Sequence, residues 1–260
     1  MDAAVKRLLR RYAARYETTD FLNGDPSWFM HQVHGAANRE AMAFLASCLS
    51  FGSRKQFLPK IRCLLDSAKG DVDGWVRNGL FERDFRCGCK DCFYRFFTHG
   101  HMHGFLKAYR ALLDGYGTLG EYVKHESAGD GYTAVDAICR YFASAGTESV
   151  VPKNAQSACK RVCMFLRWMV RDNSPVDIGL WSDFIDRRTL VMPLDTHVVQ
   201  QSLRLGLLES AAASMSAARR LTATLAEVFP DDPLKGDFAL FGYGVNLNSA
   251  GGLCESTFYP

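Results

Sequence analysis

One basic stretch of the chain combines a candidate nucleophile with candidate phosphate ligands. Residues 153–171 contain no Asp or Glu, and their cations are Lys153, Lys160, Arg161, Arg167 and Arg171. On a helix that turns about 100° per residue, positions 160, 167 and 171 fall within roughly 20° of one another and span about 16 Å. A lysine amine can form a Schiff base, and a row of cations suits a phosphate backbone. We therefore expect nucleophilic chemistry at Lys160, with a solvated basic face as the simpler alternative.

A carboxylate follows at a position where it could serve the same chemistry. Pro193 ends an apolar approach, and Asp195 stands where a helix should begin, as its N-cap. This helix is expected to run to Leu205 and to stop at Gly206. A carboxylate at an N-cap can also face a cleft and stabilise positive charge there. Capping alone is the simpler interpretation of Asp195.

Helical periodicity extends over nearly the whole chain, and convincing alternating strands are missing, so we predict an all-α fold. An amphipathic helix is expected near the N-terminus, and Asp25–Pro26 predicts an N-cap followed by a first helical residue. Further helices are predicted at residues 39–51, 54–67, 101–116, 119–125, 133–143, 154–171, 196–205, 214–229 and 234–245. We expect one module over 1–260, with lobes at 38–150 and 151–247 behind an N-terminal helical region at 1–35.

Composition restricts the class of protein. Of the 260 residues 48% are hydrophobic and 23% are charged, which excludes a largely disordered chain. The net charge of +3 neither requires nor excludes a polyanionic partner. No apolar run approaches the ~18 residues that a membrane span needs. Nine cysteines and a charged, amphipathic start without a secretory signal indicate a reducing, cytoplasmic compartment.

Several segments resemble known families. "PLDTHVVQQSLRLGL" resembles the "(V/L)DTHV-x-R-x-x-x-RLGL" segment of helix-hairpin-helix DNA glycosylases. "CKRVCMFLRWMVR" is similar to the helix that carries the Schiff-base lysine in the archaeal 8-oxoguanine glycosylases. "FLRWMVRDNSPVDIGLW" and "DPLKGDFALFGYGV" are more similar still to the DUF2400 family of the same superfamily. The resemblance to DUF2400 spans most of the chain, whereas that to characterised glycosylases is confined to about residues 154–207.

The resemblance to glycosylases implies an activity and a site. Lys160 matches the nucleophilic lysine and Asp195 the catalytic aspartate, and their separation of thirty-five residues is longer than in the bacterial endonuclease III type and closer to the archaeal branch. It implies a two-lobed helical fold with a cleft between the lobes. It also implies excision of an oxidised purine, foremost 8-oxoguanine, with lyase activity, by a bacterial, nucleoid-associated monomer that binds damaged double-stranded DNA. The chain departs from the pattern at Lys153–Cys159, which replaces the usual Gly-rich hairpin, and at Gln200–Gln201, where an Arg is common.

Other residues are weaker candidates for the same functions. Arg54 and Lys55, with Lys60 and Arg62, are expected to form a second DNA-facing patch or a solvated helix face. Phe51 and Trp168 could stack on an extruded base, although core packing is the commoner role of such aromatics. Cys163 and Met164 lie within about a turn of Lys160, so we include them in a predicted base pocket.

Two alternatives belong to other classes. The first is a DNA-binding protein that keeps the scaffold without catalysis. The second is a zinc-dependent protein built on a cluster of donor residues: Cys87, Cys89, Cys92, His99, His101 and His103. Their spacing fits no standard zinc finger. We expect no cofactor, since an iron–sulfur cluster needs four closely spaced cysteines near the C-terminus and Cys254 is alone there.

Overall fold

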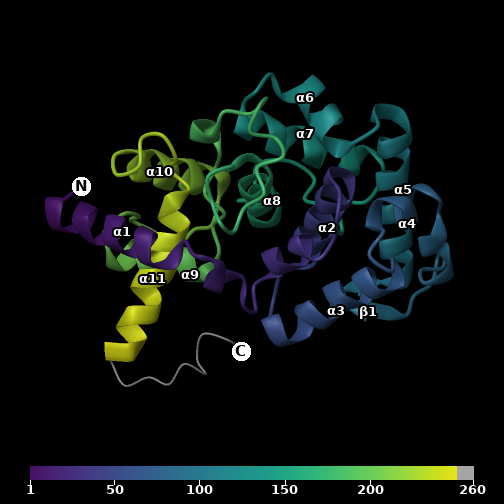
Figure 1. Ribbon diagram of the computed structural model, residues 1–260, viewed down its shortest axis with the longest axis horizontal. Coiled ribbons are helices and arrows are strands. Elements are labelled where there is room, and N and C mark those ends of the chain that lie inside the picture. The colour runs from purple at the N-terminus through teal and green to yellow at the C-terminus, as the bar shows by residue number, and fades with distance from the viewer. Residues whose placement is uncertain (251–260) are drawn as a thin grey trace.

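The computed structural model describes residues 1–250, with side chains up to residue 247 (Figure 1). The prediction of a mainly helical fold is confirmed over these residues, and Cys254 lies outside them. The α-helices are α1 Ala3–Tyr16, α2 Ala36–Leu49, α3 Arg54–Ser67, α4 Val72–Arg77, α5 His99–Tyr116, α6 Leu119–Ser127, α7 Gly131–Ser144, α8 Lys160–Val170, α9 Thr196–Arg204, α10 Met215–Ala226 and α11 Lys235–Ala250. Short 3-10 helices lie at Thr19–Leu22, Pro26–His31, Leu80–Arg83 and Arg187–Thr189.

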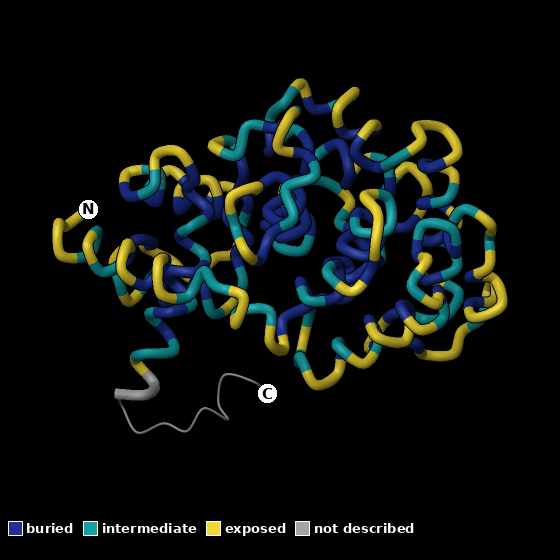
Figure 2. The backbone as a smooth tube through the Cα atoms, in the orientation of Figure 1, coloured by how far each residue is buried: buried dark blue, intermediate teal, exposed yellow. Residues whose placement is uncertain are grey.

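The helices fall into two groups with α8 between them (Figure 1). The helices α2 to α7 lie at one end of the molecule, and α1, α9, α10 and α11 lie at the other. Helix α8 packs against α2 and α7, whereas α1 packs along α11 and α11 packs against α9. The chain is buried through most of α2 and α8 (Figure 2), so these two helices form the centre of the core.

Capping side chains determine where several helices begin. Asp25 precedes its 3-10 helix as predicted and accepts a hydrogen bond from the Ser27 amide at 3.0 Å. Asp195 caps α9 in the same way, through the Val198 amide at 2.8 Å. These side chains satisfy backbone N–H groups that have no partner inside the helix. Both aspartates are thereby fixed at helix starts that face the same part of the molecule.

Helix α8 begins later than predicted. The expected start was Asn154, but the first helical residue is Lys160, after Cys159 in a left-handed conformation with φ +43°. Ser157 instead forms an antiparallel bridge with Ser214, just before α10. This tertiary pairing competes with helix formation over the preceding residues. Lys160 therefore stands at the very start of α8 and not within it.

A short β-hairpin was not predicted. Strand β1, Cys92–Tyr94, pairs antiparallel with strand β2, Phe97–Thr98, around a turn at Arg95 and Phe96. The buried Phe93 and Phe97 hold the hairpin against α3 and α5. Strands this short show no alternating pattern long enough to separate them from a loop.

Within residues 1–250, every helix is too short or too polar to cross a lipid bilayer.

Candidate active site

A cavity of about 820 Å³ lies where the two helical groups meet. One wall comes from Asp25, the Ser50–Gly52 turn and Arg54 at the start of α3. The other comes from α9 and α11, and the first turns of α8 close the cavity between them. Binding pockets for small organic molecules commonly measure about 300–1,000 Å³. This cavity therefore has room for a nucleobase with its sugar.

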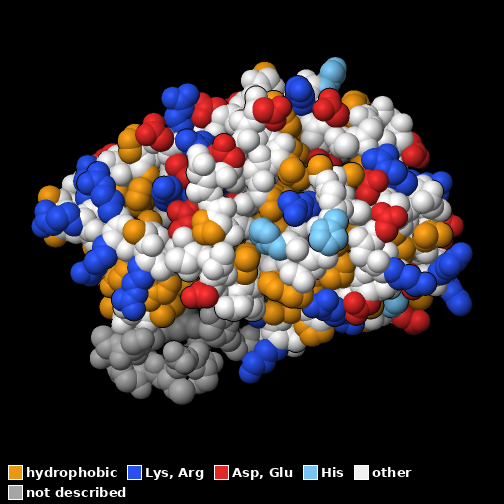
Figure 3. Space-filling model, in the orientation of Figure 1, with side chains coloured by type: hydrophobic (Ala, Val, Ile, Leu, Met, Phe, Trp, Pro, Cys, Tyr) orange, Lys and Arg blue, Asp and Glu red, His pale blue; other side chains and the backbone are white. Residues whose placement is uncertain are grey.

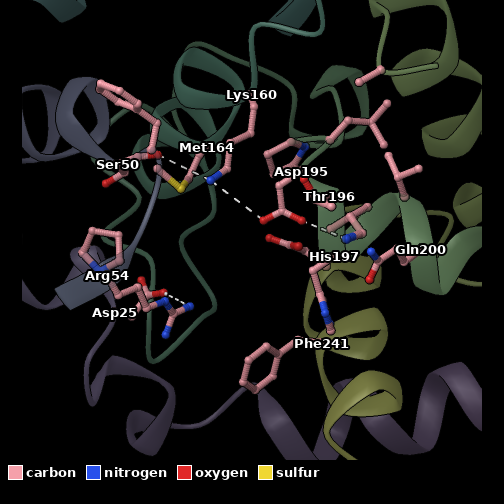
Figure 4. Close-up of a pocket in the computed structure, with 18 of the residues that line it drawn as sticks. Asp25, Ser50, Arg54, Lys160, Met164, Asp195, Thr196, His197, Gln200 and Phe241 are labelled. Carbon is pink, nitrogen blue, oxygen red and sulfur yellow. Dashed lines mark hydrogen bonds and ion pairs between the residues drawn. The ribbon is translucent and has the colours of Figure 1, made fainter. Parts of the chain in front are cut away.

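The cavity brings Lys160 and Asp195 together. The Lys160 Nζ lies 3.8 Å from Oδ2 of Asp195, as the dashed line in Figure 4 shows. Both side chains are partly exposed, at 31% and 39%. Oδ1 of the same carboxylate accepts the hydrogen bond from the Val198 amide. One oxygen of Asp195 thus fixes the carboxylate, and the other is free to face the lysine.

The C-terminus of α2 holds the start of α8. The Lys160 Nζ donates to the Ser50 carbonyl oxygen at 3.5 Å, and Arg161 donates to the Cys48 carbonyl oxygen. The last carbonyls of a helix have no partner inside it and carry partial negative charge. Cations at this point are favourable, so α2 positions the Lys160 amine at the mouth of the cavity. Burial lowers the pKa of Arg161, whose guanidinium packs 5.0 Å over the Phe51 ring.

A second charged pair lies across the cavity from Asp195 (Figure 4). Arg54 Nη2 lies 3.3 Å from Oδ2 of Asp25, whose other oxygen accepts from Ser27. Arg54 was predicted to bind DNA, and it lies at the cavity wall at the first residue of α3. Its neighbour Lys55 is exposed. This wall therefore joins the cavity to the basic surface of α3.

Sequence reasoning did not single out several residues of the cavity, among them His197 and Phe241. His197 lies two positions after Asp195, and burial lowers its pKa, so the ring is neutral near pH 7. Phe241 on α11 places its ring 6.3 Å from the His197 ring. His197 stands inside the motif that identified Asp195, and this was the available signal. Nothing local in the sequence indicated Phe241.

The structure places only some of the residues of the predicted base pocket at the cavity. Phe51 and Met164 line the cavity. The prediction was wrong for Cys163 and Trp168, because they are only 1% and 0% exposed and both side chains are buried in the core. Cys163 Sγ donates to the Ala158 carbonyl oxygen at 3.6 Å, and burial raises the pKa of its thiol. Lys153 is exposed and lies outside the residues that line the cavity.

Arg167 and Arg171 are not phosphate ligands, and this prediction was wrong. Their exposures are 3% and 1%. Arg167 pairs with Asp177 at 3.2 Å and with Asp237, and Arg171 pairs with Asp232 at 2.8 Å. Arg171 also pairs with Asp177 and Glu17. Arg167 lines the cavity with Lys160, and Arg171 is the C-cap residue of α8, but carboxylates from distant parts of the chain pair with both arginines.

This buried ion network reaches the cavity through Arg167 and Asp237, which both line it. Asp237 lines the cavity, and burial raises its pKa while the Arg167 guanidinium opposes that shift. Buried charges of this kind are stable only when opposite charges pair with them. The network therefore fixes α8 against the segments that carry Asp177, Asp232 and Asp237.

The alternative metal site does not assemble. Across residues 1–250, no three His, Cys, Asp or Glu side chains are grouped to hold a metal ion. His99 pairs through Nδ1 with the Asp84 carbonyl oxygen at 3.0 Å. His101 completes the capping box of α5, and His103 packs edge-on against Phe81. The exposed Cys87 and Cys92 and the half-buried Cys89 surround no shared centre.

The geometry describes a mainly helical protein with a lysine and an aspartate facing one cavity. A model of the family described as "Protein of unknown function (DUF2400)" matches residues 25–246, so the chain belongs to this family. The match includes Lys160, Asp195 and Arg54. No curated protein and no solved structure matches the chain.

Proposed function

We propose that this protein is a DNA glycosylase with lyase activity that removes an oxidised purine, with 8-oxoguanine as the first lesion to test. The observation that carries the proposal is the approach of Lys160 to Asp195 inside a cavity of about 820 Å³. The two residues match the nucleophile and the aspartate of the glycosylases that the sequence resembles. The two helical groups correspond, in this proposal, to the two lobes of the helix-hairpin-helix glycosylase fold.

The chemistry follows from these two side chains. The neutral Nζ of Lys160 attacks C1′ of the deoxyribose, and the bond from C1′ to the base breaks as the base leaves with its electron pair and takes up a proton. Asp195 accepts the proton that the amine loses and stabilises the positive charge on the sugar. Ring opening gives a Schiff base between C1′ and Nζ. Loss of a proton from C2′ and of the 3′ phosphate then cleaves the strand, and water releases Lys160.

Access to the cavity requires a base outside the helical stack. Enzymes that act on a base in a duplex extrude it, and damaged or mispaired bases cost the least to extrude. Met164, Phe51 and Phe241 supply apolar walls for such a base, and His197 and Gln200 supply polar groups. The proposed partner is double-stranded DNA, bound by a monomer in the bacterial cytoplasm at the nucleoid.

Basic side chains beside the cavity would hold the DNA backbone. Lys55 and Arg62 are exposed on α3, and Figure 3 shows Lys and Arg side chains along the edge of the molecule where α3 lies. Contacts from such groups to phosphates give affinity and salt dependence without sequence specificity. They replace Arg167 and Arg171 in the proposed interface.

Borohydride trapping tests the proposal. With a duplex that contains 8-oxoguanine, reduction of the Schiff base should leave a covalent protein–DNA adduct. Lys160→Gln should abolish the adduct, whereas Lys107→Gln, at an exposed lysine on α5, should form it normally. An adduct that persists in Lys160→Gln would overturn the role of Lys160. DNA binding without base release, across abasic, uracil, alkylated and oxidised sites, would instead favour the non-catalytic alternative.

A further inference from the structure

An aromatic side chain stands exposed beside the cavity. Phe96 forms the tip of the β-hairpin and is 59% exposed, more than any other large hydrophobic side chain over the part of the chain whose side chains are described. Exposure of a phenyl ring is unfavourable in water, and the neighbouring Phe93 and Phe97 are buried. The hairpin therefore buries its other aromatics and presents this one.

The hairpin is tied directly to the cavity wall. The Phe96 ring lies 5.1 Å from the ring of Phe51, which lines the cavity. The Tyr94 hydroxyl donates to the Phe51 carbonyl oxygen. Gly52 has φ +78°, and a Cβ there would lie 2.9 Å from the Arg95 guanidinium. The turn that carries Phe51 and the tip that carries Phe96 thus form one packed unit at the rim.

The shape of the tip is held in place. Arg95 has φ +52°, a backbone conformation that residues other than glycine rarely adopt. Cys92 Sγ donates to the Arg95 carbonyl oxygen at 3.1 Å, and the Arg95 guanidinium lies 5.9 Å from the Phe51 ring centre. These contacts fix the turn in a conformation that leaves Phe96 outward, so its position does not depend on a mobile loop.

Cations contact the aromatic rings of this hairpin and of Phe51. Arg95, the chain neighbour of Phe96, is exposed, and the Arg161 guanidinium lies 5.0 Å over the Phe51 ring. Lys60 on α3 lies 4.9 Å over the Phe93 ring. An outward phenyl ring among cations suits a nucleic acid, because bases stack on aromatics while phosphates pair with Lys and Arg. An apolar protein partner would leave these charges buried and unpaired.

We propose that Phe96 inserts into the base stack of duplex DNA and occupies the space left by the base that enters the cavity. This inference rests on the proposed function, since it needs an extruded base beside Lys160. The Phe51 ring then lies between the inserted Phe96 and the cavity and separates the extruded base from the remaining stack. Phe96 acts as a positioning residue and takes no part in bond breaking.

Comparison of paired and unpaired substrates tests this role. With wild-type protein, the rate of adduct formation is measured on 8-oxoguanine in a duplex and in the same strand alone. Phe96→Ala should slow the duplex reaction by about ten- to a hundredfold, as expected for the loss of one aromatic stacking contact, and should leave the single-strand reaction within about twofold. Phe96→Trp should restore the duplex rate. Equal losses on both substrates, or no loss on the duplex, would overturn the proposal.

A second readout separates this inference from the glycosylase activity. Lys160→Gln protein is bound to a duplex with 2-aminopurine at the target position, where unstacking raises fluorescence. We expect a rise in 2-aminopurine fluorescence that is lost when Phe96→Ala is added to Lys160→Gln. The control adds Tyr116→Ala instead, which removes another exposed aromatic side chain, and should keep the rise. If neither the wild-type protein nor any variant forms an adduct, the proposed function is wrong. The fluorescence measurement still tests whether Phe96 inserts into the base stack. The same rise in both double variants, or no rise at all, would contradict insertion.

Discussion

The Nζ of Lys160 lies 3.8 Å from Oδ2 of Asp195, while Oδ1 of that carboxylate caps α9 through the Val198 amide. The aspartate therefore has two separable roles, one in folding and one in the cavity. A different contact holds the lysine, because its Nζ lies at the C-terminal end of α2 and donates to the Ser50 carbonyl oxygen. Two independent helix ends thus bring together a pair that is thirty-five residues apart in sequence.

The two roles of Asp195 can be separated by substitution. Asn caps a helix about as well as Asp, so Asp195→Asn should keep the free energy of unfolding, and Asp195→Ala should lower it by about 1 kcal/mol. Both variants should lose at least about a hundredfold in adduct formation, since neither can accept a proton. Urea unfolding and single-turnover trapping measure the two effects. Normal trapping by Asp195→Asn would show that the carboxylate serves only as a cap.

The buried ion network predicts a large effect far from any chemistry. Arg171→Met leaves Asp232 and Glu17 without their cation and leaves Asp177 with Arg167 alone, so we expect a loss of about 3–5 kcal/mol of stability. Arg140→Met removes an exposed pair with Asp136 and should cost at most about 1 kcal/mol. Denaturant unfolding compares the two variants. Equal free energies of unfolding for the two variants would mean that the Arg171 guanidinium does not stabilise the buried carboxylates.

The basic surface of α3 predicts a change in salt dependence. Lys55 is exposed beside the cavity wall, and each phosphate contact contributes about 0.9 to the slope of log K against log salt concentration. Lys55→Ala should therefore reduce the slope by about one unit. Arg220→Ala, on the distant α10, should leave it unchanged. Fluorescence anisotropy over a salt series measures both slopes, and equal slopes would place the DNA elsewhere on the surface.

Helix α11 touches the cavity through a close glycine contact. A Cβ at Gly244 would lie 2.2 Å from Cε1 of His197, so Gly244→Ala must displace that ring. Gly104→Ala on α5 meets no atom within 4 Å and provides the matched control. Both substitutions should gain up to about 1 kcal/mol in helix propensity. Only Gly244→Ala should also lose adduct formation, and activity equal to that of the control would exclude a role for His197.

His197 also predicts a pH dependence of stability. Burial lowers its pKa below the usual value of 6.5, so the unfolded chain binds this proton more readily than the folded protein. Stability from this group is present above pH 6.5 and falls as the pH decreases through that value toward the lower pKa of the folded state. Urea midpoints from pH 7.5 to 5.5 should fall less in His197→Asn than in wild type. Parallel curves would contradict the shift.

The residue spacing in α8 predicted which side chains lie on one face of the helix, but not which of them are exposed to solvent. Lys160 and Arg167 lie within α8 and both line the cavity, so they share the face that the spacing predicts, whereas Arg171 is the C-cap residue. The sequence could not show which part of that face meets water, because its covering carboxylates come from Glu17, Asp177, Asp232 and Asp237, far apart along the chain. The exposed basic stripe was therefore the wrong interpretation beyond Lys160.

Other features of the site depended on information outside local pattern. The roles of Lys160 and Asp195 were predicted from a resemblance, since a 35-residue separation alone says nothing about distance. The start of α8 was missed because Ser157 pairs with Ser214 across the fold. The hairpin with Phe96 was missed because strands of three and two residues are too short to show alternation. The caps at Asp25 and Asp195 were predicted correctly because they depend on neighbouring residues.

The salt-bridged face of α8 has a mechanical consequence. A hinge between the two helical groups at this face would have to separate Arg167 and Arg171 from carboxylates that are buried with them, which is strongly unfavourable. The protein is therefore expected to be a rigid body whose cavity keeps its width, and under the proposed function it would bind DNA in this form. The nucleic acid, and not the protein, must then bend and unstack for a lesion to enter the cavity. A lesion at a flexible, weakly paired position of the DNA should therefore enter the cavity fastest.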